Sequence, residues 1–202
     1  MTLLGQLVVY FPIVHFLIIA WTFLLFVEHP SALTISWLMF CTYLVPPLLY
    51  RLYSFGRPVQ AARLVLNRRE HCHWWIAHQM QMLYAAVPAF EALLRLVPGL
   101  YSAWLRLWGS TVGKRVYWTP CVEIIDRHML AIGDDVIFGH RVVCSSHAIT
   151  KRPTGELILL FSPTRIGSGT FLGAKTRIGP GVRIPEKTVV PYNTEYRFAY
   201  AE

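Results

Sequence analysis

The sequence is short of charge and of cysteine. Only 15% of its 202 residues are charged, against about 25% in a typical soluble domain. Residues 1–50 contain no lysine or arginine and one charged side chain, Glu28, and all 19 basic residues follow from Arg51 onward. This distribution argues against an ordinary soluble globular protein. A hydrophobic share of 54% excludes intrinsic disorder.

Four cysteines are too few for a disulfide framework, and none of them forms a C-x-x-C pair. Cys41 lies in an apolar run, and Cys144 lies in an inward position of the repeat described below. We therefore expect reduced thiols and a folded region that faces a reducing compartment.

Two apolar runs predict membrane-spanning helices. Leu3–Val27 is 25 residues without Asp, Glu, Lys or Arg, long enough to cross a hydrocarbon core of about 30 Å. Ala32–Tyr50 is shorter, and we expect Pro46-Pro47 to break its last turn. A cleaved signal peptide would need a basic start and a small-residue cleavage site, which the sequence lacks. We expect a transmembrane helical hairpin over residues 1–50.

Basic residues predict the orientation of this hairpin. The turn Glu28–Ser31 has no Lys or Arg, whereas five arginines follow the second run: Arg51, Arg57, Arg63, Arg68 and Arg69. The positive-inside rule puts both termini in the cytoplasm, with these arginines near anionic headgroups. A net charge of +8 is also compatible with nucleic-acid binding. The basic residues are scattered, however, and no recognition motif is present. We expect no nucleic-acid partner.

Residues 51–109 are basic at first and then helical. Pro88 and Pro98 divide the stretch into short helices, and polar residues interrupt its apolar pattern. Its many tryptophans and tyrosines suit the depth of the lipid headgroups. We expect helices that lie on the membrane surface. A third span is the alternative, and it would move the following domain to the opposite side.

A six-residue repeat occupies residues 110–202. Each hexad starts with an apolar residue, and six of the eleven starts are followed by glycine. The starts are Val112, Trp118, Ile124, Ile132, Phe138, Cys144, Ile166, Leu172, Ile178, Ile184 and Val190. Two extra residues follow the third hexad, and a loop insertion over residues 150–165 follows the sixth. Such a long run in register is the strongest signal in the chain.

Three hexads predict one triangular coil of a parallel β-helix. The first residue of each hexad points inward, and a small residue beside it permits the corner between two faces. Neighbouring coils pair at roughly 4.8 Å. We expect three full coils and a partial fourth that ends near Asn193.

The repeats resemble the left-handed β-helix of the hexapeptide-repeat acyltransferases, a family that includes galactoside, maltose and serine acetyltransferases. WLRLWGSTVGKRVYWTP (Trp104–Pro120) and IIDRHMLAIGDDVIFGHRVVCSSH (Ile124–His147) are most similar to its membrane-anchored branch. The likeness covers residues 104–191. It implies a homotrimer that uses an acyl-coenzyme A, acetyl-CoA by default, as co-substrate between subunits, with no permanently bound cofactor.

The resemblance also implies a general base. In this family a histidine just before an extruded loop takes a proton from the acceptor, and His147 has that position. An imidazole with an ordinary pKa near ~6.5 suits this task. Because Ile124 and Cys144 start the third hexads of successive coils, we expect them to stack and to bring Asp126 beside His147. Asp126 then orients the imidazole, or alternatively caps a corner turn.

Further site residues are expected around this pair. Candidates for the acceptor site are His140, Ser145 and Ser146, and those for coenzyme A are Lys151, Arg152, Gly173, Lys175 and Arg177. The inserted loop, apolar from Leu157 to Phe161, either packs on a neighbouring subunit or forms a flap over the substrate.

Two other functions compete with acyl transfer. A zinc-dependent lyase is suggested by three histidines, His128, His140 and His147, because some left-handed β-helices are carbonic anhydrases. The seven-residue gap between His140 and His147 differs from the ligand spacing of those enzymes. We expect no metal. The other alternative is a trimeric membrane scaffold without catalysis. Our leading prediction is a multi-pass acyltransferase of the bacterial inner membrane. Its catalytic domain lies on the cytoplasmic face and acylates a hydroxyl or amine of a membrane-proximal glycan or lipid-linked acceptor.

Overall fold

The computed structural model describes residues 3–56, 60–66 and 72–197. Arg57, Arg68 and Arg69, which support the predicted orientation, lie outside these residues. The chain forms two compact units, one from residues 1–58 and 70–87, the other from residues 59–69 and 88–202. The boundaries expected at positions 50 and 109 differ from this division, because the segment between them is shared by the two units.

The first unit is helical. Its elements are α1 (Leu3–Leu7), the 3-10 turn η1 (Val8–Tyr10), α2 (Phe11–Glu28), α3 (Ala32–Tyr43), α4 (Val45–Ser54) and α5 (His73–Ala86). Ser31 and Thr34 form a reciprocal capping box at the start of α3. The helical stretch Leu3–Glu28 is long and apolar enough to cross a membrane, and α3 with α4 forms a second apolar stretch bent by 43°.

The break in the second stretch lies at Leu44, before the two prolines and not in the last turn of Ala32–Tyr50 as expected. Pro46 and Pro47 occupy the first turn of α4, where a missing N–H costs nothing, and a helix interrupted just before them continues in a new direction. Large apolar side chains of α2 point outward, with Trp21 57% and Phe23 52% exposed. An outward face of this kind is suited to lipid.

Helix α5 packs on α2 and α4 and is part of the helical unit. The Tyr84 hydroxyl donates to the Thr42 carbonyl at 2.6 Å, and the Trp75 indole donates to the Gly5 carbonyl at 3.2 Å. The Trp75 and Tyr84 side chains thereby satisfy backbone carbonyls of α1 and α3. Helix α5 is thus an integral part of the helical unit, and the expectation that helices of residues 51–109 lie on the membrane surface stays a prediction.

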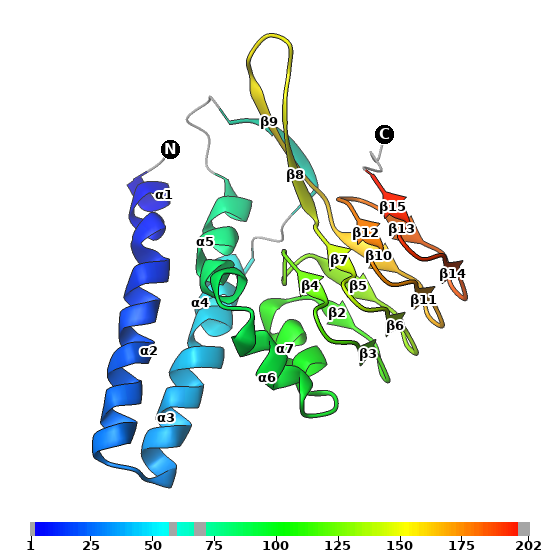
Figure 1. The fold of residues 1–202 in the computed structure, drawn as a ribbon. Helices are drawn as coiled ribbons and strands as arrows, with labels where there is room; N and C mark the ends of the chain where they lie inside the picture. Colours follow the sequence, from blue (N-terminus) through cyan, green and yellow to red (C-terminus); the bar gives the residue numbers. More distant parts are fainter. Residues whose placement is uncertain (1–2, 57–59, 67–71, 198–202) are drawn as a thin grey trace. The chain divides into compact units, whose positions relative to one another are not determined.

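The second unit is a parallel β-helix preceded by α6 (Ala89–Arg95) and α7 (Leu100–Trp108) (Figure 1). Its strands form three parallel four-stranded sheets. Sheet I contains β2 (Thr111–Val112), β5 (Leu130–Ile132), β10 (Thr164–Ile166) and β13 (Arg183–Ile184). Sheet II contains β3 (Tyr117–Trp118), β6 (Ile137–Phe138), β11 (Phe171–Leu172) and β14 (Val189–Val190). Sheet III contains β4 (Glu123–Ile124), β7 (Val143–Cys144), β12 (Arg177–Ile178) and β15 (Glu195–Tyr196).

The predicted hexad starts stack in register on the three sheets. Ile124 pairs with Cys144, and Cys144 with Ile178, as the hexad frame predicts. The column continues to Tyr196, which pairs with Ile178. The fourth coil is therefore complete, and the expected end near Asn193 is too early. The inward position of this last hexad is occupied by Tyr196, whereas the hexad starts were recognised by aliphatic and other apolar residues. The apolar pattern alone therefore did not reveal the last hexad.

Most corners of the β-helix use the same backbone turn. The fourth residue of the hexad adopts a positive φ, for example 54° at Arg115 and 61° at Lys175. The third hexads of the first two coils depart from this turn, and Arg127 and His147 are absent from the positive-φ residues described. Both departures lie at the corner between sheets III and I. This corner carries the two extra residues in one coil and the insertion in the next.

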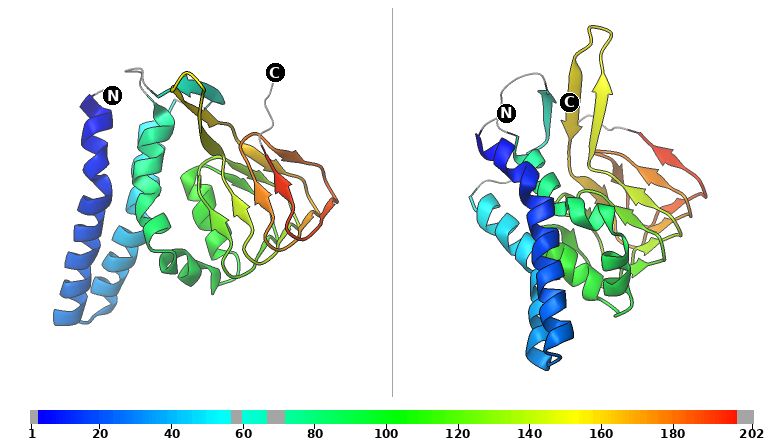
Figure 2. Two further views of the ribbon diagram at one scale, coloured as in Figure 1. Left: turned by 45° about the horizontal axis from the view of Figure 1, so that its top comes forward. Right: turned by 60° about the vertical axis from the view of Figure 1, so that its left-hand side comes forward.

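The insertion is a β-hairpin and not a loop. Strands β8 (His147–Lys151) and β9 (Leu157–Phe161) pair antiparallel, and β1 (Ala62–Val65) adds to the other edge of β9. The hairpin projects from the stacked coils in both further views (Figure 2). Residues 62–65 were expected in a helical region, and pairing with a strand almost 100 positions later determines their conformation instead.

Candidate functional site

His147 and Asp126 meet at the corner between sheets III and I. The Nδ1 atom of His147 lies 2.8 Å from Oδ2 and 3.0 Å from Oδ1 of Asp126. Asp126 is buried, with 1% of its side chain exposed, whereas 16% of the His147 side chain is exposed. The imidazole is therefore accessible from outside while its partner is shielded from water.

Asp126 is also held by the backbone of the next coil. The main-chain N–H of Ser146 donates to its Oδ2 at 2.8 Å. The two alternatives for this residue are thus both present in the geometry: the carboxylate contacts the imidazole and also accepts a backbone N–H near a corner. A buried carboxylate with two such partners has a defined position, which restricts the orientation of the imidazole.

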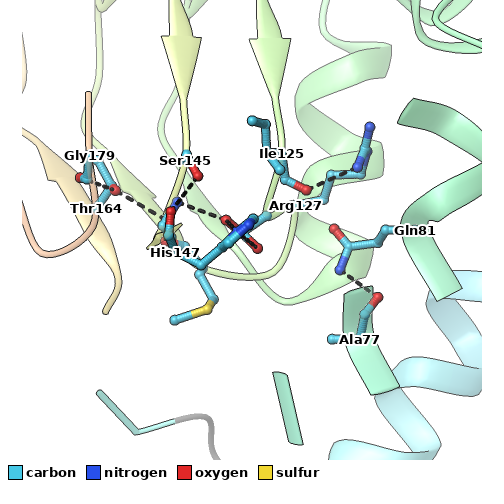
Figure 3. Close-up of polar contacts among 11 residues, drawn as sticks. Ala77, Gln81, Ile125, Arg127, Ser145, His147, Thr164 and Gly179 are labelled. Atoms are coloured by element: carbon cyan, nitrogen blue, oxygen red, sulfur yellow. Dashed lines mark hydrogen bonds and ion pairs between the residues drawn. The ribbon is translucent and has the colours of Figure 1, made fainter. Parts of the chain in front are cut away.

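The two serines before His147 have different surroundings. Figure 3 shows the first of them, Ser145, beside His147. Ser145 is half-buried, and its hydroxyl donates to the His147 carbonyl at 2.7 Å. Ser146 is fully buried, and its hydroxyl donates to the Met129 carbonyl at 2.9 Å. Ser146 therefore has a structural place between coils, and Ser145 lies nearer the surface beside the imidazole.

A buried charge cluster, defined here as Glu91, Arg95, Tyr101 and Arg127, ties α6 to the β-helix. Its member Arg127 directly follows Asp126 in the sequence. The Glu91 carboxylate accepts from the Arg127 guanidinium, from Arg95 at 2.8 Å and from the Tyr101 hydroxyl at 2.7 Å. Glu91 is 4% and Arg127 3% exposed. Burial and the neighbouring carboxylate raise the pKa of Tyr101 above its usual range.

This cluster anchors the loop that carries Asp126. The Arg127 guanidinium also donates to the Ile125 carbonyl at 3.1 Å (Figure 3). Sequence analysis missed the link because Glu91 and Arg127 are 36 positions apart. The one signal was the spacing of Glu91 and Arg95, which accounts for a helical pair but not for a contact with the β-helix.

The basic residues expected to bind coenzyme A divide into two groups. Lys175 and Arg177 line a hollow of about 580 Å³ on sheet III, together with Arg141 and Glu123. Lys151 and Arg152 lie at the far end of β8 from His147, where Arg152 pairs with Glu156 at 3.2 Å. The structure thus brings the first pair together in one site and places the second pair on the hairpin.

Gly173, a candidate for coenzyme A binding, has a packing role between two coils. The sequence predicted only that a small residue beside a hexad start permits the corner. A Cβ atom at this position would lie 2.6 Å from the carbonyl carbon of Pro191 in the next coil. This contact is shorter than atoms tolerate, so the close approach of two coils requires glycine here.

The other two candidate histidines differ in exposure. His140 is exposed at the corner between sheets II and III, and His128 is 8% exposed in the loop after Asp126. In the part of the chain that the structure describes, no three His, Cys, Asp or Glu side chains are grouped to hold a metal ion. The four cysteines are free, and burial raises the pKa of the Cys144 thiol to about 12.

Comparison with known proteins finds similarity at the level of solved structures. No protein-family profile matches the sequence, and no curated protein matches it. A hexapeptide-repeat acetyltransferase from Vibrio cholerae is 16% identical, with a TM-score of 0.39 over 56% of this chain and 82% of its own.

Two further structures are similar over about half of the chain. A maltose O-acetyltransferase from Clostridium difficile is 16% identical, with a TM-score of 0.42 over 55% of this chain and 74% of its own. A galactoside acetyltransferase, solved in complex with coenzyme A, is 16% identical, with a TM-score of 0.36 over 51% of this chain and 66% of its own.

Proposed function

We propose that this protein is a membrane-bound acyltransferase that moves an acyl group, acetyl by default, from a coenzyme A thioester to a hydroxyl or amine. The observation that carries the proposal is the contact between the His147 Nδ1 atom and the buried Asp126 carboxylate. The hexapeptide repeat and the place of His147 before the hairpin supply the family resemblance. The left-handed sense of the β-helix belongs to the same proposal.

The pair has the chemistry of a general base. When Nδ1–H donates to Asp126, the lone pair of the ring is at Nε2, which accepts the proton of the acceptor hydroxyl or amine. The oxygen or nitrogen attacks the thioester carbonyl, and the carbon–sulfur bond breaks. The proton then passes from Nε2 to the departing sulfur, which leaves as the thiol. Asp126 stabilises the imidazolium between these steps.

Coenzyme A is proposed to lie along the outside of sheet III. Lys175, Arg177 and Arg141 in the hollow on this sheet supply positive charge for its phosphates. His147 follows β7 of the same sheet, so a molecule that extends across sheet III from these cations reaches the corner with the imidazole. Lys151 and Arg152 lie on the hairpin, away from this hollow. They would therefore contact the acceptor or the coenzyme only where either molecule reaches the hairpin.

We propose that the helical unit anchors the enzyme in the bacterial inner membrane. The apolar stretch Leu3–Glu28 and the bent pair α3–α4 supply two spans. The arginines after the second span, with Arg51 and Arg63 among the described residues, put the β-helix on the cytoplasmic face. An anchored enzyme acts on an acceptor that is itself held at the membrane, such as a lipid-linked glycan.

A homotrimer is part of the proposal, and the outward surface of sheet II supports it. Tyr117, Ile137, Phe171 and Val189 form one stacked column, each 41–73% exposed. The corresponding columns of sheets I and III contain charged residues, including Arg165, Arg183, Glu123 and Arg177. An apolar column on one of three faces is typical of a subunit contact.

Loss of the base tests the proposal directly. We expect His147→Ala to lower kcat/KM by about 10²–10⁴-fold, and Asp126→Asn by about 10–100-fold because the imidazole loses its orientation. The assay measures transfer of labelled acetyl from acetyl-CoA to extracts of cell-envelope glycans and lipids, followed by mass spectrometry of the labelled product.

Two variants control for charge and folding. Asp135→Asn changes an exposed corner carboxylate, and His29→Ala changes an exposed histidine of the helical unit, so both should keep full activity. Unchanged transfer by His147→Ala in folded protein would contradict the mechanism. Failure of millimolar coenzyme A to raise the thermal stability of the protein would favour the scaffold.

A further inference from the structure

A second hollow of the β-helix unit carries a concentration of positive charge. It has a volume of about 480 Å³ and lies where the start of α7 meets the first coil. Its basic lining residues are Arg95, Arg106, Lys114 and Arg115. None of its lining residues is acidic, and Val97 and Trp118 supply an apolar wall. This composition suits an anion that also has an apolar part.

The positive charge is only partly compensated within the unit. The Arg115 guanidinium pairs with Asp135 at 2.6 Å, and Arg95 shares the Glu91 carboxylate with a second guanidinium. Arg106 donates to main-chain carbonyls, which are neutral. The Lys114 side chain is exposed and forms no ion pair with any residue that the structure describes. The Asp134 carboxylate also lies at this corner, where it accepts the Lys114 N–H at 2.6 Å. The five cations, counting Arg127, exceed the three carboxylates Glu91, Asp134 and Asp135 by two.

Exposed apolar side chains lie beside the hollow. Leu96 is 76%, Val97 53% and Leu100 42% exposed, and Leu93 on the preceding helix is 56% exposed. Val97 is itself part of the hollow's wall. Basic side chains next to exposed leucines are typical of a surface that inserts at the level of the headgroups, with cations on lipid phosphates and apolar groups toward the acyl chains.

We propose that this hollow binds the phosphate of an anionic phospholipid headgroup, with Lys114 and Arg106 as its main ligands. A phosphate ester is the shared chemistry of a lipid headgroup and of a soluble phosphate, and the exposed leucines favour the lipid. The site is distinct from the hollow on sheet III that is proposed for coenzyme A. It also does not depend on acyl transfer, so its test is independent of that activity.

The test measures lipid binding by the full chain purified in a neutral detergent. Native mass spectrometry follows a titration with phosphatidylglycerol, with phosphatidylcholine as the zwitterionic reference and glycerol 3-phosphate as the soluble phosphate. We expect preferential binding of phosphatidylglycerol, weakened about tenfold by Lys114→Glu, because repulsion replaces one charge–phosphate attraction. The variant should fold, since the hydrogen bonds of Lys114 use its main chain: its N–H donates to the Asp134 carboxylate at 2.6 Å, and its carbonyl accepts the Asp135 N–H at 2.9 Å.

Lys187→Glu is the matched control. Lys187 is exposed and occupies the same corner of the β-helix in the fourth coil, with the same φ of 54° that Arg115 has in the first. This variant should bind phosphatidylglycerol as the parent does. Equal binding by Lys114→Glu and the parent, or equal loss in both variants, would overturn the site. Binding of glycerol 3-phosphate without a preference for phosphatidylglycerol would overturn its assignment to a lipid.

Discussion

Asp126 joins two coils of the β-helix through one carboxylate. Its Oδ2 accepts the N–H of Ser146 and lies 2.8 Å from the imidazole of His147. Because the side chain is buried, these interactions replace water as the partners of the charge. A carboxylate whose position is determined by the backbone also determines where the imidazole lies, as the role proposed for His147 requires.

The Glu91 carboxylate has a comparable role for the loop that carries Asp126. We expect Glu91→Gln to lower the free energy of unfolding by about 3–5 kcal/mol, because the buried Arg127 guanidinium loses its counter-charge. Thermal unfolding followed by tryptophan fluorescence in detergent measures the effect. Glu195→Gln, which removes an exposed partner of Arg197, should change stability by less than about 1 kcal/mol. Equal melting temperatures for the two variants would contradict a buried structural ion pair.

At the scale of one element, the hairpin contains a strand, β9, that is buried on both faces and is therefore not an extruded loop. Ile158, Leu159, Leu160 and Phe161 are each 0–7% exposed, so both faces of β9 are covered. A continuous apolar run is typical of a strand buried on both sides. Leu157–Phe161 had this pattern, but its partner β1 lies before α5 in the sequence. The pairing could not be inferred without the tertiary structure.

Truncation of one leucine tests whether the hairpin is an integral part of the β-helix unit. We expect Leu159→Ala to destabilise the protein by about 2–5 kcal/mol, since this side chain is fully buried. Leu157→Ala is the matched control in the same strand, where the side chain is 39% exposed, and it should cost much less. Chemical unfolding of the two variants gives the difference. Similar stabilities would indicate a hairpin that is not packed.

At the scale of the whole molecule, one face of the β-helix differs from the other two, because the outward column of sheet II is apolar. A closed trimer places this column against a different patch of the next subunit, because cyclic contacts of this order are heterologous. The column is made of the residues just before the hexad starts on sheet II, which the periodicity alone treats as equivalent on all three sheets.

Charge on this column should separate the subunits. We expect Phe171→Glu to convert the proposed trimer to monomers in detergent, because a carboxylate cannot be buried there without a partner. Size-exclusion chromatography with light scattering gives the mass of the protein. Arg183→Glu, on the outward column of sheet I, should leave the mass unchanged. A parent protein that is already monomeric, or a trimer that survives Phe171→Glu, would contradict this interface.

The sequence by itself determined the apolar N-terminal helices, the β-helix with its stacked hexads and the proximity of Asp126 to His147. The helices follow from long apolar runs. The other two features follow from the six-residue period, since every sixth residue repeats the same environment from coil to coil. Only the tertiary structure decided the sharing of residues 51–109 between two units, the pairing of β1 with β9, the Glu91–Arg127 ion pair and the basic hollow beside α7. Each of these joins segments that are distant in the sequence, and no repeat or spacing encodes such contacts.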